Sequence, residues 1–178
     1  EEYLKRFEVS INVQRKIGFK IPEDLEFALR STEQFWEENE DFLISMIRKW
    51  GKPALVEIWN KQFAYFIVKY EFNFVDSVKK AAALTTDQID TGNSKNYEIK
   101  FRDKDNELKY PLILHLSPSG AIERVIYSLL ERAAMKDEEH AMLPLWLSPT
   151  QVRLCPVNDC FVKYCEKMAE NIEKNNIR

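Results

Sequence analysis

The chain has 178 residues, of which 45% are hydrophobic and 31% are charged, and its formal net charge is −3 at pH 7. This length suits one domain, or one domain with part of another, and eleven Phe, seven Tyr and four Trp can fill a core. The slight negative charge excludes unspecific attraction to nucleic acid over the whole surface. No apolar run approaches the roughly 20 residues that cross a bilayer, so we expect a soluble, cytoplasmic protein.

Three cysteines lie five residues apart near the end of the sequence, at Cys155, Cys160 and Cys165. Their odd number and the lack of a Cys-x-x-Cys pair favour reduced thiols over a disulfide or a metal site. We expect them to serve as small apolar residues in a reducing compartment, the cytosol.

Local patterns predict four elements in the first part of the chain. Apolar residues alternate from Phe7 to Gln14 and predict a strand. Either Ser31 or Thr32 can cap a helix that runs to Trp50 and stops at a Gly-Lys-Pro sequence. Two further strands are expected over residues 54–59 and 63–75, with a turn at residues 60–62.

The strand over residues 63–75 carries Lys69, Glu71 and Asn73 in line on one face, because side chains alternate along a strand. One interpretation is the wetted face of an antiparallel sheet, which is common. The other is the floor of a binding site, since the apolar residues Tyr65 and Val75 flank the polar ones. The pattern alone does not decide between the two.

The second half of the sequence predicts a strand over residues 84–91, with Thr86, Gln88 and Asp90 on one side. A hairpin tip is expected at Asp105-Asn106. Residues 110–116 predict a buried strand, and residues 119–135 predict a helix with its apolar side chains inward, namely Ile122, Val125, Ile126, Leu129, Leu130 and Ala133. A domain boundary is expected near Leu143, followed by a strand over residues 152–157 and a helix from Asp159 to about Asn175.

The corner between the second-half strand and its helix holds residues that can bind a ligand. Gly120 lets the backbone come close to a ligand, and the free N–H groups of a helix start favour an anion. Arg124, about one turn into the helix, could hold the same anion with two parallel hydrogen bonds. The alternative is a surface Glu-Arg pair on an ordinary helix, which this pattern by itself favours.

His115 ends an otherwise apolar strand, and the only other histidine is His140, in a polar segment. A lone histidine in this position is usually a packed, hydrogen-bonded core residue. A zinc site needs three or four ligands, so His115 can at most be one ligand of a site completed from outside the chain. We interpret His140 as a solvated linker residue.

Three stretches, in the right order and spacing, together resemble the threonyl-tRNA synthetases, especially the archaeal type. PLILHLSPSGAIERVIYSLLE is similar to the third signature motif of class II aminoacyl-tRNA synthetases. KYEFNFVDSVKKAAALTTDQID is similar to the two active-site strands before that motif, and LPLWLSPTQVRLCPV to the passage into the anticodon-binding domain. The first two signature motifs are absent, so the resemblance implies a fragment that is inactive by itself.

The implied fold is α+β. Residues 1–142 would form the C-terminal part of the catalytic domain, with an antiparallel sheet and flanking helices. Residues 143–178 would form a linker and then the first strand and helix of an α/β anticodon-binding domain.

The resemblance also implies roles for single residues. Arg124 matches the arginine that holds the γ-phosphate of ATP, which binds with Mg²⁺, and Gly120 lies at the same corner. Lys69 matches a lysine near the substrate. Gln88 matches a glutamine lining the adenylate site, with Thr86 as its same-face neighbour. His115 matches one of three protein ligands of a zinc ion that binds threonine, the other two lying outside this chain.

The implied reaction joins threonine to tRNA(Thr) through threonyl-adenylate, in a full-length homodimer that needs no membrane. A prolyl-type class II synthetase is an alternative, but its site has no use for the zinc that His115 would hold. A non-catalytic paralogue that only binds is another, against which the joint presence of Lys69, Gln88, His115 and Arg124 argues. An unrelated α+β domain would require all three matches to be coincidental.

Overall fold

A computed structural model describes residues 1–62, 64–136 and 141–177 of the chain. The chain divides into two compact units, residues 1–138 and residues 139–178. The identities predicted for the parts before and after residue 143, catalytic and anticodon-binding, stay predictions. Phe63, where the sequence predicts the start of a strand, and His140, interpreted as a linker residue, lie outside the described residues.

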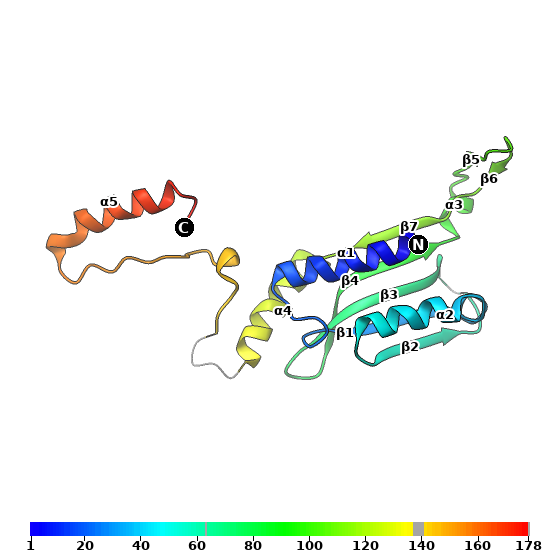
Figure 1. Ribbon diagram of the computed structural model, residues 1–178, viewed down its shortest axis with the longest axis horizontal. Coiled ribbons are helices and arrows are strands. Elements are labelled where there is room, and N and C mark those ends of the chain that lie inside the picture. The colour runs from blue at the N-terminus through cyan, green and yellow to red at the C-terminus, as the bar shows by residue number, and fades with distance from the viewer. Residues whose placement is uncertain (63, 137–140, 178) are drawn as a thin grey trace. The chain divides into compact units, whose positions relative to one another are not determined.

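A five-stranded sheet with the order β2-β1-β3-β4-β7 forms the first unit (Figure 1). Its strands are β1 (Glu26–Thr32), β2 (Ala54–Trp59), β3 (Phe66–Val75), β4 (Ala81–Asp90) and β7 (Ile113–Ser117). The pairs β1–β3, β3–β4 and β4–β7 are antiparallel, but β1 and β2 run parallel. The α+β class is confirmed, whereas the prediction of an antiparallel sheet is wrong at this edge. The cause is α2 (Glu33–Trp50), a crossover helix that carries the chain back to start β2 beside β1.

Helix α2 begins and ends where its signals predicted. The Thr32 hydroxyl accepts a hydrogen bond from the Phe35 backbone N–H at 3.3 Å, which satisfies one free donor of the first turn. Gly51 follows the helix in the left-handed conformation at φ 82°. Strand β2 has the predicted bounds, but the sequence patterns did not reveal β1, whose last residue is the cap Thr32.

Helix α1 (Glu2–Ile17) occupies the stretch for which alternation predicted a strand, so that prediction is wrong. Its buried residues recur every three or four positions: Tyr3, Phe7, Ser10, Ile11 and Gln14. Two of them, Ser10 and Gln14, are polar, so the hydrophobic pattern of the sequence did not identify them as core residues. Ser10 lies 3.1 Å from the Tyr70 hydroxyl and Gln14 donates to the Thr85 hydroxyl, which lets a helix bury them.

An aromatic cluster fills the layer between the sheet and the two helices that cover one of its faces (Figure 1). Phe7 from α1 packs edge-on against Tyr70 and Phe72 of β3, with ring centroids 5.2 and 5.5 Å away. Trp50, the last residue of α2, lies 4.6 Å from the Phe72 ring centroid. Because these rings hold both helices to one face of the sheet, α1 and α2 leave the other face uncovered, and its side chains can line a binding site.

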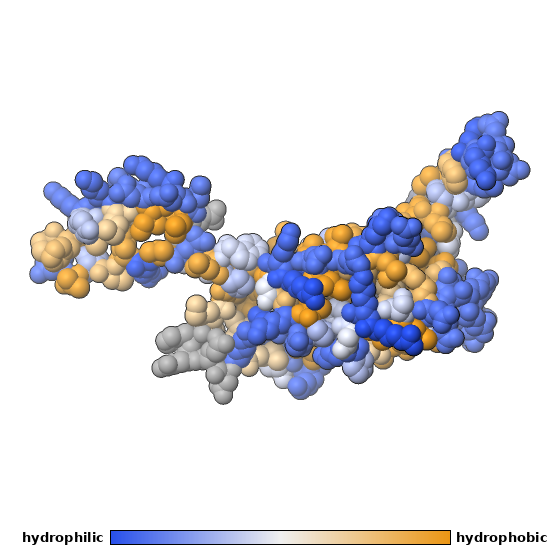
Figure 2. Space-filling model, viewed as in Figure 1, coloured by the Kyte–Doolittle hydropathy of each residue, from blue (hydrophilic) through white to orange (hydrophobic). Residues whose placement is uncertain are grey.

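Helix α4 (Ile122–Met135) buries less of itself than its pattern predicts. Among the residues expected inward, Leu129 and Ala133 are buried, but Ile122, Ile126 and Leu130 are each more than half exposed. Between β4 and β7 the chain forms the short helix α3 (Asn93–Asn96) and a hairpin of β5 (Phe101–Arg102) and β6 (Leu108–Lys109). The predicted hairpin tip is confirmed, with Asn106 at φ 61°, and the tip is hydrophilic (Figure 2).

The second unit contains 3₁₀ turns at Leu145–Leu147 and Asp159–Phe161 and the helix α5 (Val162–Glu173). Over residues 152–157, where a strand is predicted, the structure assigns no strand, so that prediction is wrong. The Asn158 side chain accepts from the Cys160 backbone N–H and so caps the second 3₁₀ turn, and α5 begins directly after that turn, at Val162 instead of the predicted Asp159. The cysteines are free thiols: Cys155 and Cys160 are exposed and Cys165 is half-buried. Among the described residues, no helix is both long and apolar enough to span a bilayer.

Candidate active site

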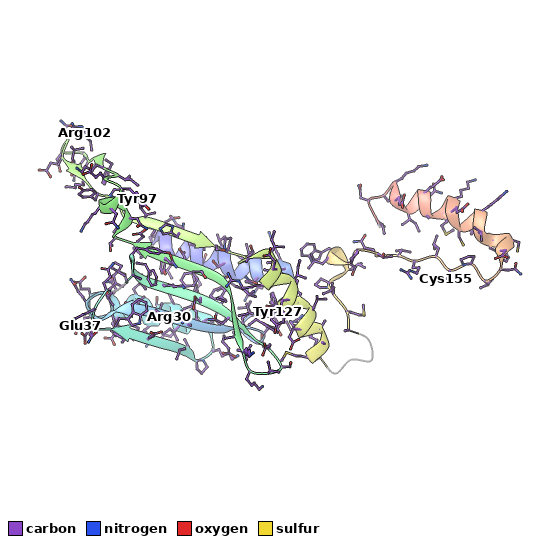
Figure 3. The ribbon with its side chains drawn as sticks, turned by 180° about the vertical axis from the view of Figure 1, so that it is seen from behind. Arg30, Glu37, Tyr97, Arg102, Tyr127 and Cys155 are labelled. Atoms are coloured by element: carbon purple, nitrogen blue, oxygen red, sulfur yellow. The ribbon has the colours of Figure 1, made fainter. Side chains whose placement is uncertain are left out.

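One row of side chains crosses all five strands on the face of the sheet opposite α1 and α2. The strand register pairs Arg30 of β1 with Glu57 of β2 and with Lys69 of β3. It continues from Lys69 to Gln88 of β4, and from Gln88 to His115 of β7. Directly paired residues point to the same side of a sheet, so these five form one line, called here the cross-strand row. Figure 3 shows the sheet from this side, with Arg30 labelled and no helix in front of the strands.

Charges at one end of the cross-strand row are paired within the protein. Arg30 donates from Nε to Glu57 Oε2 at 2.8 Å and from its terminal nitrogen to Glu71. Lys69 Nζ lies 2.6 Å from Glu71 Oε1. Burial by itself would raise the pKa of the Glu71 carboxyl, but the hydrogen bonds from Lys69 and Arg30 outweigh it and hold that pKa below its ordinary value. An anionic ligand at Lys69 would therefore compete with an ionised Glu71.

Gln88 and Thr86 lie at the centre of the same face. The Tyr65 hydroxyl donates to Gln88 Oε1 at 2.6 Å, which fixes the amide with its nitrogen turned away from Tyr65. In the part of the chain that the structure describes, that nitrogen makes no hydrogen bond, so it can donate to a ligand. Thr86 pairs in register with Glu71 on one side and Ser117 on the other, one row further along.

His115 occupies the far end of the cross-strand row and is partly open to solvent. Its Nε2 lies 2.8 Å from Asp90 Oδ2, and 44% of its side chain is exposed. The Tyr65 ring meets the imidazole edge-on, with centroids 5.6 Å apart. His115 is thus not the packed core histidine that a lone histidine usually is. Its Nδ1 makes no hydrogen bond to any described residue.

The corner after β7 is held against β4 by backbone and side-chain contacts. The Thr85 hydroxyl donates to the Pro118 carbonyl at 2.7 Å, and Gln14 Nε2 donates to the same carbonyl at 3.1 Å. Gly120 has φ +87°, and a Cβ atom there would lie 2.8 Å from the Leu84 Cα and carbonyl carbon and closer still to the Leu84 carbonyl oxygen. The close approach of the backbone to β4 therefore explains why position 120 is a glycine. Its approach to a nucleotide stays a prediction.

Arg124 lies in the first turn of α4 and is exposed. Within the described ranges it forms no hydrogen bond or ion pair, so its guanidinium is available to an outside anion. The structure thus brings Lys69, Gln88 and His115 into one row with Thr86 beside it. It places Gly120 and Arg124 apart from the row, at the corner that follows His115.

Sequence reasoning did not single out Arg30 or Glu57 on this face, and it did not foresee the contact that Asp90 makes. Arg30 belongs to β1, the strand that the patterns did not reveal, and only its cross-strand pairing places it beside Lys69. Asp90 was assigned to the correct side of its strand, but its contact with His115 joins residues 25 apart in the sequence. An acidic residue at the end of a strand and directly before a Thr-Gly-Asn turn was the available signal for Asp90.

No group of three or more His, Cys, Asp or Glu side chains among the described residues is placed to hold a metal ion. A metal at His115 would therefore need ligands from elsewhere. The donor chemistry at His115 nevertheless suits zinc. One ring nitrogen is hydrogen-bonded to a carboxylate and the other has no partner among the described residues, the pattern that metal-bound histidines show.

Comparison with known proteins adds a second line of observation. The chain is 50% identical over 180 residues to the threonine–tRNA ligase of Pyrococcus horikoshii, and 45% identical over 180 residues to that of Nitrosopumilus maritimus. This chain resembles one stretch of the threonine–tRNA ligases. Each alignment covers the whole chain but only 29% of the relative, so the chain spans under a third of the curated relatives it matches. No protein-family model matches it.

Two solved structures share the fold of this chain. The RNA-binding domain of threonyl-tRNA synthetase from Cryptosporidium parvum matches with a TM-score of 0.71 at 22% identity, over 99% of this chain and 43% of that one. A putative threonyl-tRNA synthetase from Aeropyrum pernix matches with a TM-score of 0.55 at 16% identity, over 97% of this chain and 40% of that one. At these sequence identities the structural similarity shows a shared fold and nothing about function.

Proposed function

We propose that this chain is a segment of a threonine–tRNA ligase and carries part of its aminoacylation site. The observation that carries the proposal is the identity of about one residue in two with threonine–tRNA ligases along the whole chain. The cross-strand row supports it, because it sets several polar groups in a line on a face that neither α1 nor α2 covers (Figure 3). Membership of class II and the archaeal type belong to the same proposal.

The proposed reaction has two steps. The threonine carboxylate attacks the α-phosphate of ATP, and the bond to pyrophosphate breaks to leave threonyl-adenylate. A hydroxyl of the terminal ribose of tRNA(Thr) then attacks the threonyl carbonyl, releasing AMP and a proton. Neither step needs a protein nucleophile, so catalysis rests on positioning and on cations that stabilise phosphate charge.

The position of each residue in the fold suggests which part of the substrates it would bind. Lys69 supplies a cation at the middle of the row, and Gln88 offers an amide donor next to it. Thr86 adds a hydroxyl on the same face. Arg124, unpaired among the described residues and exposed at the helix start, is suited to the γ-phosphate of ATP with its Mg²⁺. The Gly120 corner joins β7 to the helix that carries Arg124, only nine residues after His115.

His115 is proposed to be one ligand of a zinc ion, with the remaining ligands supplied from outside this chain. When bound, zinc would recognise the amino group and hydroxyl of threonine, a distinction that valine fails because it has no hydroxyl. Asp90 holds the His115 ring through Nε2, and Nδ1 has no hydrogen-bond partner among the described residues. The proposed partners are thus threonine, ATP and tRNA(Thr), with a homodimer as the full-length assembly and the cytoplasm as its location.

The test is amino-acid-dependent exchange between ATP and pyrophosphate, catalysed by the full-length protein that contains this chain. Threonine, serine, valine and proline are compared, with zinc removed and restored. We expect a preference for threonine, dependence on zinc, and a loss of about 10²-fold or more in His115→Ala and Arg124→Ala. Glu37→Ala, an exposed change on α2 (Figure 3), is the matched control and should exchange like the unmodified protein.

Two outcomes would contradict the proposal. Exchange that prefers proline would identify a prolyl-type synthetase. A well-folded protein that exchanges with none of the four amino acids would point to a paralogue that only binds. The isolated chain of 178 residues is expected to show no exchange, because it spans under a third of the ligases it resembles.

A further inference from the structure

Asp90, the last residue of β4, has a fully buried carboxylate with four hydrogen bonds. Oδ1 accepts from the backbone N–H groups of Gly92 and Asn93, both at 2.9 Å. Oδ2 accepts from the Asn93 side-chain amide at 2.7 Å and lies 2.8 Å from His115 Nε2. One oxygen therefore holds the turn after β4, and the other reaches across to β7.

The contact with Asp90 decides which ring nitrogen of His115 carries the proton. Oδ1 of Asp90 accepts from two backbone N–H groups and Oδ2 accepts from the Asn93 amide, and such converging donors favour the ionised carboxylate. An ionised carboxylate only accepts hydrogen bonds, so Nε2 must donate. In a neutral imidazole the lone pair then lies on Nδ1, the nitrogen that has no partner among the described residues.

We infer that Asp90 is a positioning residue that holds His115 in the tautomer and ring orientation needed to bind a metal through Nδ1. The inference rests on the proposed function, since zinc at His115 is part of it. Metal-bound histidines commonly donate their second N–H to a carboxylate, and loss of that partner typically costs 10- to 100-fold in metal affinity. The Asp90 carboxylate is well suited to this work, because two backbone N–H groups prevent it from moving.

A purely structural role for Asp90 is the competing explanation, and Asp76 provides the comparison. Asp76 follows β3 at the opposite end of the sheet and is also buried. Its Oδ1 accepts from the backbone N–H groups of Val78 and Lys80, and its Oδ2 accepts from the Tyr127 hydroxyl at 2.7 Å. The two aspartates thus hold equivalent turns, but only Asp90 contacts the histidine.

The experiment compares Asp90→Asn with Asp76→Asn in the full-length protein. An asparagine keeps one oxygen to accept from the backbone of the turn and presents an NH₂ group where Oδ2 was. At position 90 this NH₂ would donate to His115 Nε2 and favour the proton on Nδ1, which blocks the metal lone pair. Zinc affinity is measured by competition with a chromophoric chelator, and KM for threonine and for ATP by pyrophosphate exchange.

We expect Asp90→Asn to weaken zinc binding 10- to 100-fold and to raise KM for threonine while KM for ATP changes little. Asp76→Asn should leave the zinc affinity unchanged. Equal zinc affinities in Asp90→Asn and the unmodified protein, or equal losses in both variants, would overturn the inference. His115→Ala separates the two proposals: if it binds zinc as tightly as the unmodified protein, zinc at His115 itself is wrong.

A measurement on the unmodified, zinc-free protein keeps the inference testable should Asp90→Asn not fold. Selective ¹⁵N labelling of histidine reports by NMR which ring nitrogen carries the proton, and the His115→Ala spectrum assigns the signal. A proton on Nε2 supports the inference, and a proton on Nδ1 overturns it.

Discussion

Two glycines, Gly51 and Gly120, share the left-handed backbone region but differ in what surrounds them. Gly51 has φ +82° and open space within 4 Å of the point where a Cβ would lie, whereas Gly120 has φ +87° and faces the Leu84 backbone of β4. A side chain at position 51 would add only the strain of its own backbone conformation, while one at position 120 would also push the corner away from the sheet. The corner that carries Arg124 therefore depends on a missing Cβ.

Gly120→Ala should accordingly destabilise the protein more than Gly51→Ala. We expect about 1 kcal/mol for Gly51→Ala, from backbone conformation alone, and about 2–4 kcal/mol for Gly120→Ala, where overpacking adds to it. Urea unfolding of both variants of the full-length protein measures the difference. Equal midpoints would show that the approach to Leu84 does not constrain position 120.

At the scale of elements, α1 shows how a two-residue alternation misled the prediction. Phe7 is fully buried, but Val9 is 49% exposed, although a strand would have placed both on one face. The helix instead places Phe7 on one face with Ser10, Ile11 and Gln14, where the Ser10 hydroxyl and the Gln14 amide nitrogen form hydrogen bonds with groups on β3 and β4. Such partners are far away in sequence, so no local pattern could reveal them.

Alanine substitutions at Phe7 and Val9 distinguish the helix from the predicted strand. Phe7→Ala should lower the free energy of unfolding by about 3–5 kcal/mol, because it opens a cavity in the aromatic cluster. Val9→Ala should change it by about 0.5 kcal/mol or less, since its side chain faces solvent. The check is again the denaturant midpoint. Comparable large losses at both positions would favour the strand and refute the helix.

At the scale of the whole first unit, the two faces of the sheet have different roles. The face covered by α1 and α2 stabilises the fold, and the opposite face carries the proposed site. Asp87 points toward α1, where Arg6 donates to its two oxygens at 2.9 and 2.8 Å. Its neighbour Gln88 belongs to the cross-strand row on the other face. Burial raises the pKa of the Asp87 carboxyl even though Arg6 opposes that rise. The Arg6–Asp87 pair therefore belongs to the buried layer between α1 and the sheet.

Neighbouring substitutions on β4 should therefore give opposite results. Gln88→Ala should lower pyrophosphate exchange by at least about tenfold while the melting temperature stays within a few degrees. Asp87→Ala should lower the free energy of unfolding by roughly 3 kcal/mol, because Arg6 loses its partner, and leave exchange per folded molecule near normal. Calorimetry and exchange on the full-length protein test both. A loss of stability in Gln88→Ala with no loss of exchange would contradict this division.

The sequence by itself determined the features that local rules govern. The Thr32 cap, the end of α2 at Gly51, the bounds of β2 and the hairpin tip at Asn106 follow from turn and capping chemistry over a few residues. Alternation placed Lys69 and Glu71 on one face of β3, as the structure confirms. Motif resemblance named Gln88, His115 and Arg124, whose roles stay predictions.

Tertiary structure alone decided which residues meet. The parallel β1–β2 edge, Arg30 beside Lys69, Gly120 against Leu84 and Asp90 against His115 all arise from pairings between distant segments. Strand register fixes such neighbours, and register depends on the fit of a whole sheet against its helices, not on any one stretch. The same dependence explains why α1 is a helix: its buried polar residues find partners only once β3 and β4 are in place.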